Sequence, residues 1–340
     1  MPPAALPLAV SLGDPAGVGP ELLASAWLSR VPRRLPVFFA LGGAGLLRAA
    51  AKARGLDLPV RVIADPAEAS GCFDAALPVL DCGDTAYAPG KPARAGAELA
   101  LASLTQATRL AVSGAASGVV TGPIAKALLA EVGFYHPGQT EFVAEACGIA
   151  PEDAVMMLAA PSLRTVPLTV HIPLSAVPGA IGIELILRRA RIAAAALTRD
   201  FGIARPRLAV AALNPHAGEA GRMGSEEAEI IAPAIARLQA EGIAATGPHP
   251  ADALFTPRAR GGYDLALCMY HDQALIPLKT LDFDAGVNVT LGLPIVRTSP
   301  DHGTAFAIAG RGSADPGATI AALRLAGECA ARRAAARVPA

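Results

Sequence analysis

The segment LPLAVSLGDPAGVGPELLASAWLS, residues 6–29, contains the unit that decides the fold. The apolar run 6–12 predicts a buried strand, the glycines and prolines that follow predict a turn, and 21–29 predicts a helix. Such a turn can present backbone N–H groups to an anion, or it can simply join a strand tightly to a helix. Its glycines, at 13, 17 and 19, do not fit the G-x-G-x-x-G dinucleotide fingerprint.

The same order of apolar run, turn and helical stretch recurs along the 340 residues. Short apolar runs indicate strands at 6–12, 37–41, 60–63, 118–121, 154–159, 165–171, 207–212, 265–269 and 287–290. Stretches rich in Ala and Leu indicate helices at 21–29, 45–54, 93–111, 123–132, 140–146, 183–201, 226–241 and 317–337. This alternation predicts an α/β fold with a largely parallel sheet and helices on both faces.

The composition argues against several classes of partner. Lys+Arg and Asp+Glu both number 29, so no basic excess indicates binding to nucleic acid or to an anionic membrane. The mean hydropathy of +0.43 is high, but the longest uncharged stretch, 165–183, holds three prolines and a histidine, which indicates a buried interior. The five cysteines form no CxxC pair and no signal peptide is recognisable, so we expect a cytoplasmic protein.

Three of the six histidines follow apolar strand candidates: His171, His216 and His271. In open α/β sheets, ligands bind outside the carboxyl ends of the strands. Three imidazoles delivered there could hold one divalent metal ion and leave a position open for substrate. Alternatively, each histidine forms a hydrogen bond within its own turn, and the wide spacing leaves this reading open.

Several other polar residues end apolar runs in the same way. Asp272 follows His271 directly and either orients that ring, accepts a proton, or caps a turn. Lys279, Asn288 and Arg297 flank short apolar runs, and a lysine and an arginine near one pocket suit a substrate with phosphate or carboxylate groups.

Six segments together resemble the PdxA family of 4-hydroxythreonine-4-phosphate dehydrogenases. They are GDPAGVGPE (13–21), TGPIAK (121–126), LNPHAGEAGRMGSEE (213–227), GPHPADALF (247–255), MYHDQALIPLK (269–279) and GVNVTLGLPIVRTSPDHGTAFAIAGRG (286–312). The first and the last segments also resemble the corresponding ends of isocitrate and isopropylmalate dehydrogenases. The resemblance therefore implies that fold, with two α/β/α domains and a cleft between them.

The resemblance implies an activity and a cofactor set. Family members oxidise 4-phosphohydroxy-L-threonine with NAD or NADP to a β-keto acid, which decarboxylates to 3-amino-2-oxopropyl phosphate on the route to pyridoxal phosphate. A divalent ion (zinc, magnesium or cobalt) is held by three histidines that match His171, His216 and His271. The family is a homodimer whose site lies at the subunit interface, with contacts from both chains.

The resemblance also implies roles for individual positions and for the domains. Substrate contacts match Gln139, Thr140, Lys279, Asn288 and Arg297, Asp272 and Lys279 are the catalytic candidates, and the loop Asp301, His302 and Gly303 would face the nucleotide. Residues 1–125 with 280–340 would form the cofactor-side domain, and 126–279 the domain for metal, substrate and dimerisation.

One departure from the family affects substrate choice. The family has GHTE where this chain reads GQTE, so Gln139 replaces a substrate-contacting histidine and cannot carry a proton near neutral pH. A related dehydrogenase acting on another diol acid, such as a four-carbon sugar-acid phosphate or an aromatic dihydrodiol, is therefore an alternative. Further alternatives are a phosphate acyltransferase-like enzyme and a non-catalytic anion-binding protein.

Overall fold

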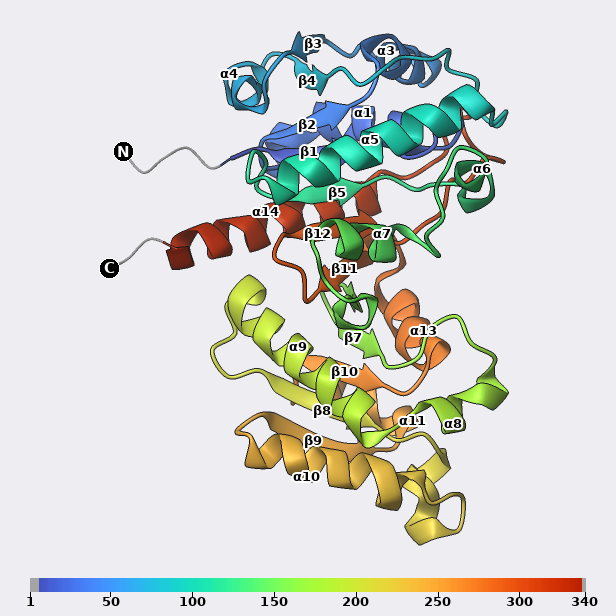
Figure 1. Ribbon diagram of the computed structural model, residues 1–340, viewed down its shortest axis with the longest axis vertical. Coiled ribbons are helices and arrows are strands. Elements are labelled where there is room, and N and C mark those ends of the chain that lie inside the picture. The colour runs from blue at the N-terminus through green and yellow to red at the C-terminus, as the bar shows by residue number, and fades with distance from the viewer. Residues whose placement is uncertain (1–5, 338–340) are drawn as a thin grey trace. The chain divides into compact units, whose positions relative to one another are not determined.

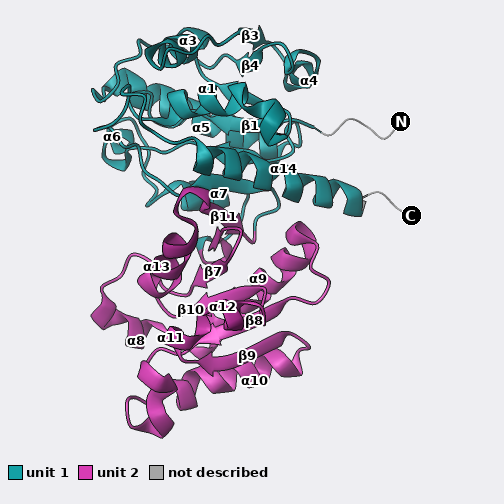
Figure 2. Ribbon diagram, turned by 180° about the vertical axis from the view of Figure 1, so that it is seen from behind, with its two compact units in different colours: residues 1–151, 293–340 teal, residues 152–292 magenta. Residues whose placement is uncertain are grey.

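In the computed structural model, which describes residues 6–337, the chain forms two compact units (Figure 1 and Figure 2). Unit 1 is Met1–Pro151 with Leu293–Ala340, and unit 2 is Glu152–Gly292. The sequence predicts changes of domain near residues 125 and 279, whereas the chain changes unit after 151 and after 292. Residues 126–151 lie with unit 1 because Leu129 and Phe134 pack into the same core as Ala97, Ala100 and Leu104.

In its described residues, unit 1 contains six strands in the order β3-β4-β2-β1-β5-β12. All of the described pairings among them are parallel. Their bounds are β1 Leu8–Ser11, β2 Phe38–Leu41, β3 Val60–Ile63, β4 Leu77–Leu80, β5 Val119–Thr121 and β12 Arg297–Pro300. Strands β1 and β2 are buried along their whole length, which explains why they read as continuous apolar runs.

Helices cover both faces of the unit 1 strands. Helix α5 packs on β1, β2 and β5, while α1 contacts α3 and α14 on the other side (Figure 1 and Figure 2). The longer helices are α1 Gly19–Leu28, α3 Ala44–Ala53, α5 Arg94–Val112, α7 Gln139–Ala146 and α14 Gly317–Arg337, and the short ones are α2 Arg30–Arg33, α4 Ala69–Cys72 and α6 Lys126–Ala130.

Unit 2 contains six strands in the order β11-β6-β7-β10-β8-β9. Their bounds are β6 Val155–Ala159, β7 Arg164–Pro167, β8 Arg207–Ala211, β9 Ala244–His249, β10 Leu265–Cys268 and β11 Val287–Leu291. Strands β7, β10, β8 and β9 run parallel, but β6 is antiparallel to both β7 and β11. The parallel part of this unit is therefore the part that carries the histidine-bearing strand ends.

The helices of unit 2 include two that match the sequence patterns closely. Helix α9 spans Ile183–Phe201, and it ends at Gly202, whose φ of 70° gives the left-handed cap that favours glycine. The predicted helix 226–241 appears as a π-helical turn, η5 Glu227–Ile231, followed by α10 Ala232–Ala240. The remaining helices are α8 Val177–Ala180, α11 Ala251–Leu254, α12 Pro257–Arg260 and α13 His271–Asp282.

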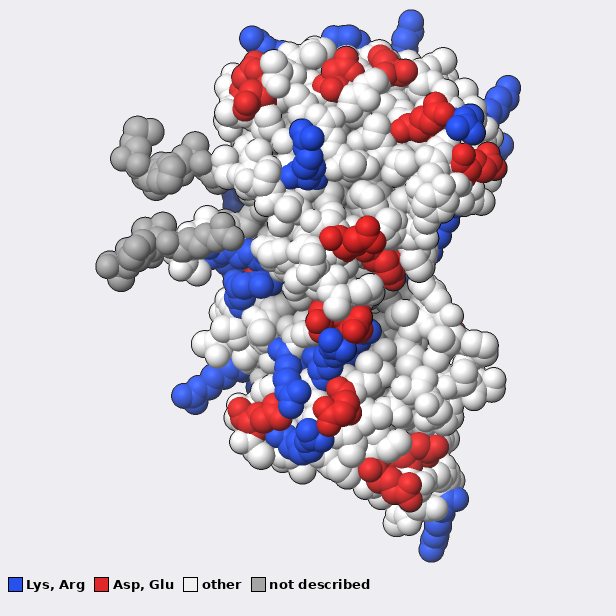
Figure 3. Space-filling view, in the orientation of Figure 1, with Lys and Arg blue, Asp and Glu red and all other residues white. Residues whose placement is uncertain are grey.

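The α/β class expected from the sequence is confirmed. Strands β4, β9 and β12 and helix α13 are not anticipated by the sequence patterns, and β7 ends at Pro167 instead of reaching His171. Within residues 6–337, no helix has both the length and the apolar character needed to cross a membrane. On the face shown in Figure 3, basic and acidic side chains are interspersed, without an extended basic surface.

Candidate active site

The three strands that precede the predicted metal ligands are neighbours. Strand β10 lies between β7 and β8 and pairs with both in parallel, so the three carboxyl ends lie at one edge. His271 begins α13 two residues beyond Met269, His171 follows β7, and His216 lies in the turn after β8. This arrangement is the one in which α/β proteins bind ligands beyond their strand ends.

His171 and His271 stand together at this edge. Their ring centroids are 5.9 Å apart. Both line a pocket of about 250 Å³ whose walls include Leu174, Val177 and Tyr270. The Nδ1 atom of His271 lies 2.7 Å from Oδ1 of Asp272. An ionised carboxylate only accepts, so Nδ1 is the donor in this contact, and in a neutral ring Nε2 then has the lone pair that a metal ion requires.

His216 is placed differently. It is exposed and lies in a turn, Pro215–Gly221, in which residues 216–220 all have positive φ values between 44° and 77°. In the described part of this chain, no three His, Cys, Asp or Glu side chains converge as a metal site. A single chain therefore brings two of the three predicted imidazoles together and leaves the third apart.

Backbone strain marks two of these histidines. His171 has a φ of 24° and His216 a φ of 52°, values that residues with a side chain rarely adopt. Each such residue costs about 1–3 kcal/mol and persists only where the surrounding structure enforces it. The strain is evidence that the chain maintains these two ring positions for a reason other than stability.

The donor set and the spacing fit a divalent transition metal. With metal–nitrogen bonds of about 2.1 Å, a ring centre lies roughly 3.2 Å from the ion, so two rings on one ion have centres at most about 6.4 Å apart. The observed 5.9 Å is within that limit. Asp272 supplies the carboxylate partner that metal-binding imidazoles usually have on their other nitrogen.

Helix α13 extends the site along one groove. His271, Asp272, Leu275, Ile276, Lys279 and Thr280 line a second pocket of about 400 Å³. These residues recur at intervals of four, so they share one face of the helix. The groove thus connects an imidazole, a carboxylate and an ammonium group. Asn288, on β11 in the same unit, has a buried Oδ1 with no hydrogen-bond partner among residues 6–337.

Gln273 ties together the strand ends beneath the histidines. Its Nε2 donates to the carbonyl oxygen of Ala212 at 2.8 Å, and its Oε1 accepts from the amide of Met269 at 2.7 Å. The side chain is buried, and it links the ends of β8 and β10. Gln273 is therefore a support for His271 that its position in the sequence did not single out, although it follows His271 by only two residues.

In unit 1, Arg297 is the centre of a second polar group. Its Nη2 donates to Oγ1 of Thr121 at 2.8 Å and to Oε1 of Gln139 at 3.3 Å, while Nε2 of Gln139 donates to the carbonyl oxygen of Gly122 at 2.9 Å. Burial lowers the pKa of Arg297 to about 10, and the nearby charge of Glu141 acts in the opposite direction. The guanidinium is thus charged at neutral pH but weakly solvated, a condition that favours a bound anion.

The remaining predicted positions of unit 1 lie on α7 and on one loop. Thr140 is half-buried in the first turn of α7, next to Gln139. In the loop, Nδ1 of His302 lies 3.0 Å from the carbonyl oxygen of Gly303. The next residue, Thr304, accepts a hydrogen bond from the amide of Val18 at 2.9 Å.

The contact between this loop and the residue 13–19 turn depends on a glycine. A Cβ atom at Gly17 would lie 2.7 Å from the carbonyl oxygen of Thr304, closer than real Cβ contacts allow. The two segments that resemble the ends of isocitrate and isopropylmalate dehydrogenases therefore lie against each other. Only glycine at position 17 permits this approach without a shift of the loop.

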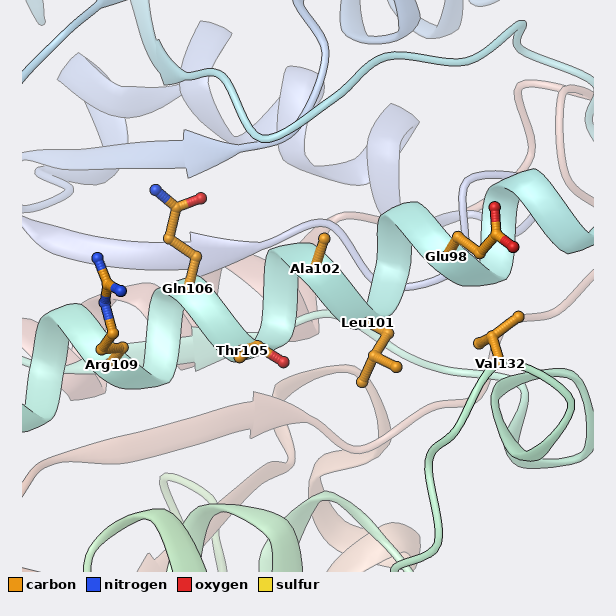
Figure 4. Close-up of a pocket in the computed structure, with 7 residues that line it drawn as sticks. All are labelled: Glu98, Leu101, Ala102, Thr105, Gln106, Arg109 and Val132. Atoms are coloured by element: carbon orange, nitrogen blue, oxygen red, sulfur yellow. The ribbon is translucent and has the colours of Figure 1, made fainter.

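A larger groove of about 580 Å³ lies elsewhere in unit 1 (Figure 4). It follows the outer side of α5, with Arg109 towards one end and Glu98 towards the other. The side chains between them are Leu101, Ala102, Thr105 and Gln106, with Val132 beside the helix. This groove contains none of the residues that the sequence singled out.

Comparison with known proteins decides the family. The model of the family described as pyridoxal phosphate biosynthetic protein PdxA matches residues 34–326. This chain belongs to the PdxA family. It is 66% identical over 328 residues to a 4-hydroxythreonine-4-phosphate dehydrogenase of Erythrobacter litoralis, covering 96% of this chain and 98% of that protein. Family membership, predicted from six short segments, is confirmed.

Two further relatives of this PdxA-family chain extend the comparison. A 4-hydroxythreonine-4-phosphate dehydrogenase of Zymomonas mobilis is 56% identical over 328 residues, covering 96% of both chains. The crystal structure of a 4-hydroxythreonine-4-phosphate dehydrogenase from Klebsiella pneumoniae has a TM-score of 0.85 and 36% identity, covering 97% of this chain and 99% of that chain. The likeness therefore holds in sequence and in fold over nearly the whole length.

Proposed function

We propose that this chain is a dehydrogenase that oxidises 4-phosphohydroxy-L-threonine with NAD or NADP. The product is a β-keto acid that loses CO2 to give 3-amino-2-oxopropyl phosphate, in the biosynthesis of pyridoxal phosphate. The observation that carries the proposal is the 66% identity, over nearly the full length, to a relative named for this reaction. The paired imidazoles at the ends of β7 and β10 support it, because they suit metal-assisted oxidation of an alcohol.

In this proposal, His171, His216 and His271 hold one divalent ion (zinc, magnesium or cobalt). When bound, the ion supplies Lewis acidity, which lowers the pKa of the substrate hydroxyl and later stabilises the negative charge left by departing CO2. Asp272 fixes the tautomer of His271 through the 2.7 Å contact, and its exposed carboxylate is the proposed acceptor of the hydroxyl proton. Asp272 thus combines an orienting and a proton-handling role.

The other proposed roles concern binding and orientation. Arg297, held by Thr121 and Gln139, binds the phosphate, and Lys279 provides a second positive charge that neutralises substrate anions during the reaction. Asn288 and Thr140 contact the substrate through their polar side chains. The loop of Asp301, His302 and Gly303 binds the nucleotide, whose nicotinamide supplies the hydride acceptor. We place the enzyme in the cytoplasm.

We also propose that the enzyme is a homodimer and that His216 reaches the ion from the neighbouring subunit. The supporting observation is that one chain pairs His171 with His271 but leaves His216 outside their group. Closed twofold dimers are the commonest oligomers, and a shared site would occur twice in each dimer.

A direct assay tests the reaction. Purified enzyme with 4-phosphohydroxy-L-threonine and NAD or NADP should generate the absorbance of the reduced nicotinamide and release CO2. Exhaustive chelation should abolish both signals, and added zinc, cobalt or magnesium should restore them. His216→Ala should retain the fold but lose bound metal and several orders of magnitude in turnover. Full activity after chelation would reject the metal role.

Mixed dimers test the sharing of the site. When His216→Ala and His271→Ala subunits are unfolded together and reassembled in equal amounts, about a quarter of wild-type activity should return, because half of the dimers are mixed and each has one complete site. If all three ligands came from one subunit, the mixture would stay as inactive as either parent.

A second candidate substrate class is favoured by one observation, the presence of Gln139 beside Arg297. A neutral amide can form hydrogen bonds with the substrate, but unlike a protonated histidine it does not require a negatively charged group there. Phosphorylated four-carbon sugar acids and aromatic dihydrodiols should therefore be assayed beside 4-phosphohydroxy-L-threonine. A higher kcat/KM for any of these would replace the proposed substrate but would leave the reaction type unchanged.

A further inference from the structure

The turn that carries His216 has a left-handed backbone. Its φ and ψ values are 52° and 28° at His216, 52° and 45° at Ala217, 77° and −4° at Gly218, 44° and 56° at Glu219, and 56° and 37° at Ala220. Only Gly218 belongs to the residue type that adopts this region freely. Contacts with a neighbouring group must therefore stabilise this turn, because the backbone of the four other residues does not favour positive φ values.

Glu227 is the side chain best placed to do so. It is buried, and its Oε1 accepts hydrogen bonds from the amides of Leu213 at 2.9 Å and Asn214 at 2.7 Å. Its Oε2 accepts from Nδ2 of Asn214 at 3.0 Å. The carboxylate is thus hydrogen-bonded to the chain between the end of β8 and the start of the turn.

The same carboxylate also lies against the middle of the turn. A Cβ atom at Gly218 would be 2.7 Å from Oε2 of Glu227, so the turn and the carboxylate are in close contact there. Glu227 begins the π-helical turn η5, whose last residue, Ile231, is fully buried and anchors the segment. Such π turns inside helices are frequent at functional sites.

We infer that Glu227 is a positioning residue for metal binding: its carboxylate holds the left-handed turn so that the imidazole of His216 has one fixed orientation. The inference rests on the proposed role of His216 as a ligand. All three hydrogen bonds to Glu227 come from N–H donors, so a group that only accepts is required. Glutamine would keep the shape but direct an N–H group at one of these donors.

The test is a titration of the metal-free, full-length enzyme with Co²⁺ alone, followed through the visible absorbance of the bound ion. For Glu227→Gln we expect the Co²⁺ affinity to fall about 10–100-fold, the usual effect of losing a group that orients a ligand, with an altered absorption spectrum. The matched control is Glu229→Gln, an exposed carboxylate of the same π turn, which should bind Co²⁺ as the wild type does.

A second variant keeps the test decisive if Glu227→Gln does not fold. Gly218→Ala keeps the carboxylate but places a Cβ atom 2.7 Å from Oε2 of Glu227, so the turn and the carboxylate must move apart, and Co²⁺ binding should weaken in the same way. Wild-type affinity and spectrum in the folded fraction of either variant would overturn the inference, even if the melting temperature fell.

His216→Ala separates this inference from the proposed function. If His216→Ala binds Co²⁺ as tightly as the wild type, the proposed ligand role fails, and the inference fails with it. If His216→Ala loses Co²⁺ while Glu227→Gln binds it normally, only the positioning role of Glu227 is wrong.

Discussion

Arg297 and Gln139 are joined by a hydrogen bond of 3.3 Å from Nη2 to Oε1. The amide of Gln139 is in turn fixed by the carbonyl oxygen of Gly122, so the guanidinium is oriented by a neutral group. Gln139, the residue that departs from the family pattern, is therefore in direct contact with Arg297, the residue proposed to bind the substrate phosphate.

Removing this amide should weaken substrate binding. We expect Gln139→Ala to raise KM for the phosphorylated substrate on the order of tenfold, since a hydrogen bond to a charged group is lost. Turnover should change less, because Gln139 acts on binding. Steady-state kinetics measure both, and Gln106→Ala, in the separate groove on α5, should leave both unchanged.

Introducing a titratable ring at the same position should create a pH dependence. In Gln139→His, the introduced imidazole gains a proton as the pH falls. Its pKa should lie below the ordinary value of about 6.5, because the positive charge of Arg297 is close. KM of the variant should then show an additional dependence on pH between about 5 and 8 that the wild type lacks. Identical pH profiles for the two enzymes would place residue 139 outside the substrate site.

Asp272 should matter through its contact with His271. In Asp272→Asn the acceptor for Nδ1 is weakened, and metal affinity should fall about 10–100-fold. Competition with a chromophoric chelator measures this. Asp284→Asn, an exposed carboxylate just beyond α13, is the control and should retain wild-type affinity. Equal affinities for the two variants would contradict the orienting role.

Gln273 should contribute to stability. Gln273→Leu leaves the Ala212 carbonyl and the Met269 amide without their partner, and each such buried group costs about 1–3 kcal/mol. Urea unfolding followed by circular dichroism should show a loss of roughly 2–5 kcal/mol. Gln239→Leu, which removes one hydrogen bond at an exposed position, should lose much less.

Acid should weaken unit 2 through Asp264. Hydrogen bonds from Arg207 hold the pKa of Asp264 below its usual 3.8. The folded-state pKa is the lower one, so this stabilisation is present above pH 3.8 and disappears as the pH falls through the folded value. The melting temperature of Asp264→Asn should be lower than that of the wild type at neutral pH. The two should converge below pH 3.8.

Much of the fold was predictable because long segments have consistent patterns. Helices 183–201 and 317–337 agree with α9 and α14 to the residue. The failures have identifiable physical causes. Strand β12, Arg297–Pro300, is polar in sequence yet fully buried, and α13 has Pro277 inside it, a residue that normally argues against a helix. Burial of polar strands and tolerance of an internal proline depend on tertiary contacts that periodicity does not reveal.

The candidate site was predictable in its residues but not in its geometry. The sequence indicates that His171, His216 and His271 follow strands, and the strands are indeed adjacent. The sequence does not indicate that two of the rings pair while the third lies in a left-handed turn. Residues such as Ala217 and Glu219 give no sign in the sequence that their φ values are positive. Thr121, Gln273 and Glu227 were missed for a related reason, because their roles arise from contacts distant in sequence.

Unit 1 consists of two segments of chain separated in sequence by unit 2, and this order affects how it folds during synthesis. Strand β12 and helix α14, which complete that unit, come from the last segment of the chain, while unit 2 is one continuous stretch. As the chain leaves the ribosome, unit 2 can form its sheet while β5 still lacks its neighbour β12. The β5–β12 pairing therefore cannot form until residues 297–300 have been synthesised, and until then the edge of β5 can attract other chains or chaperones.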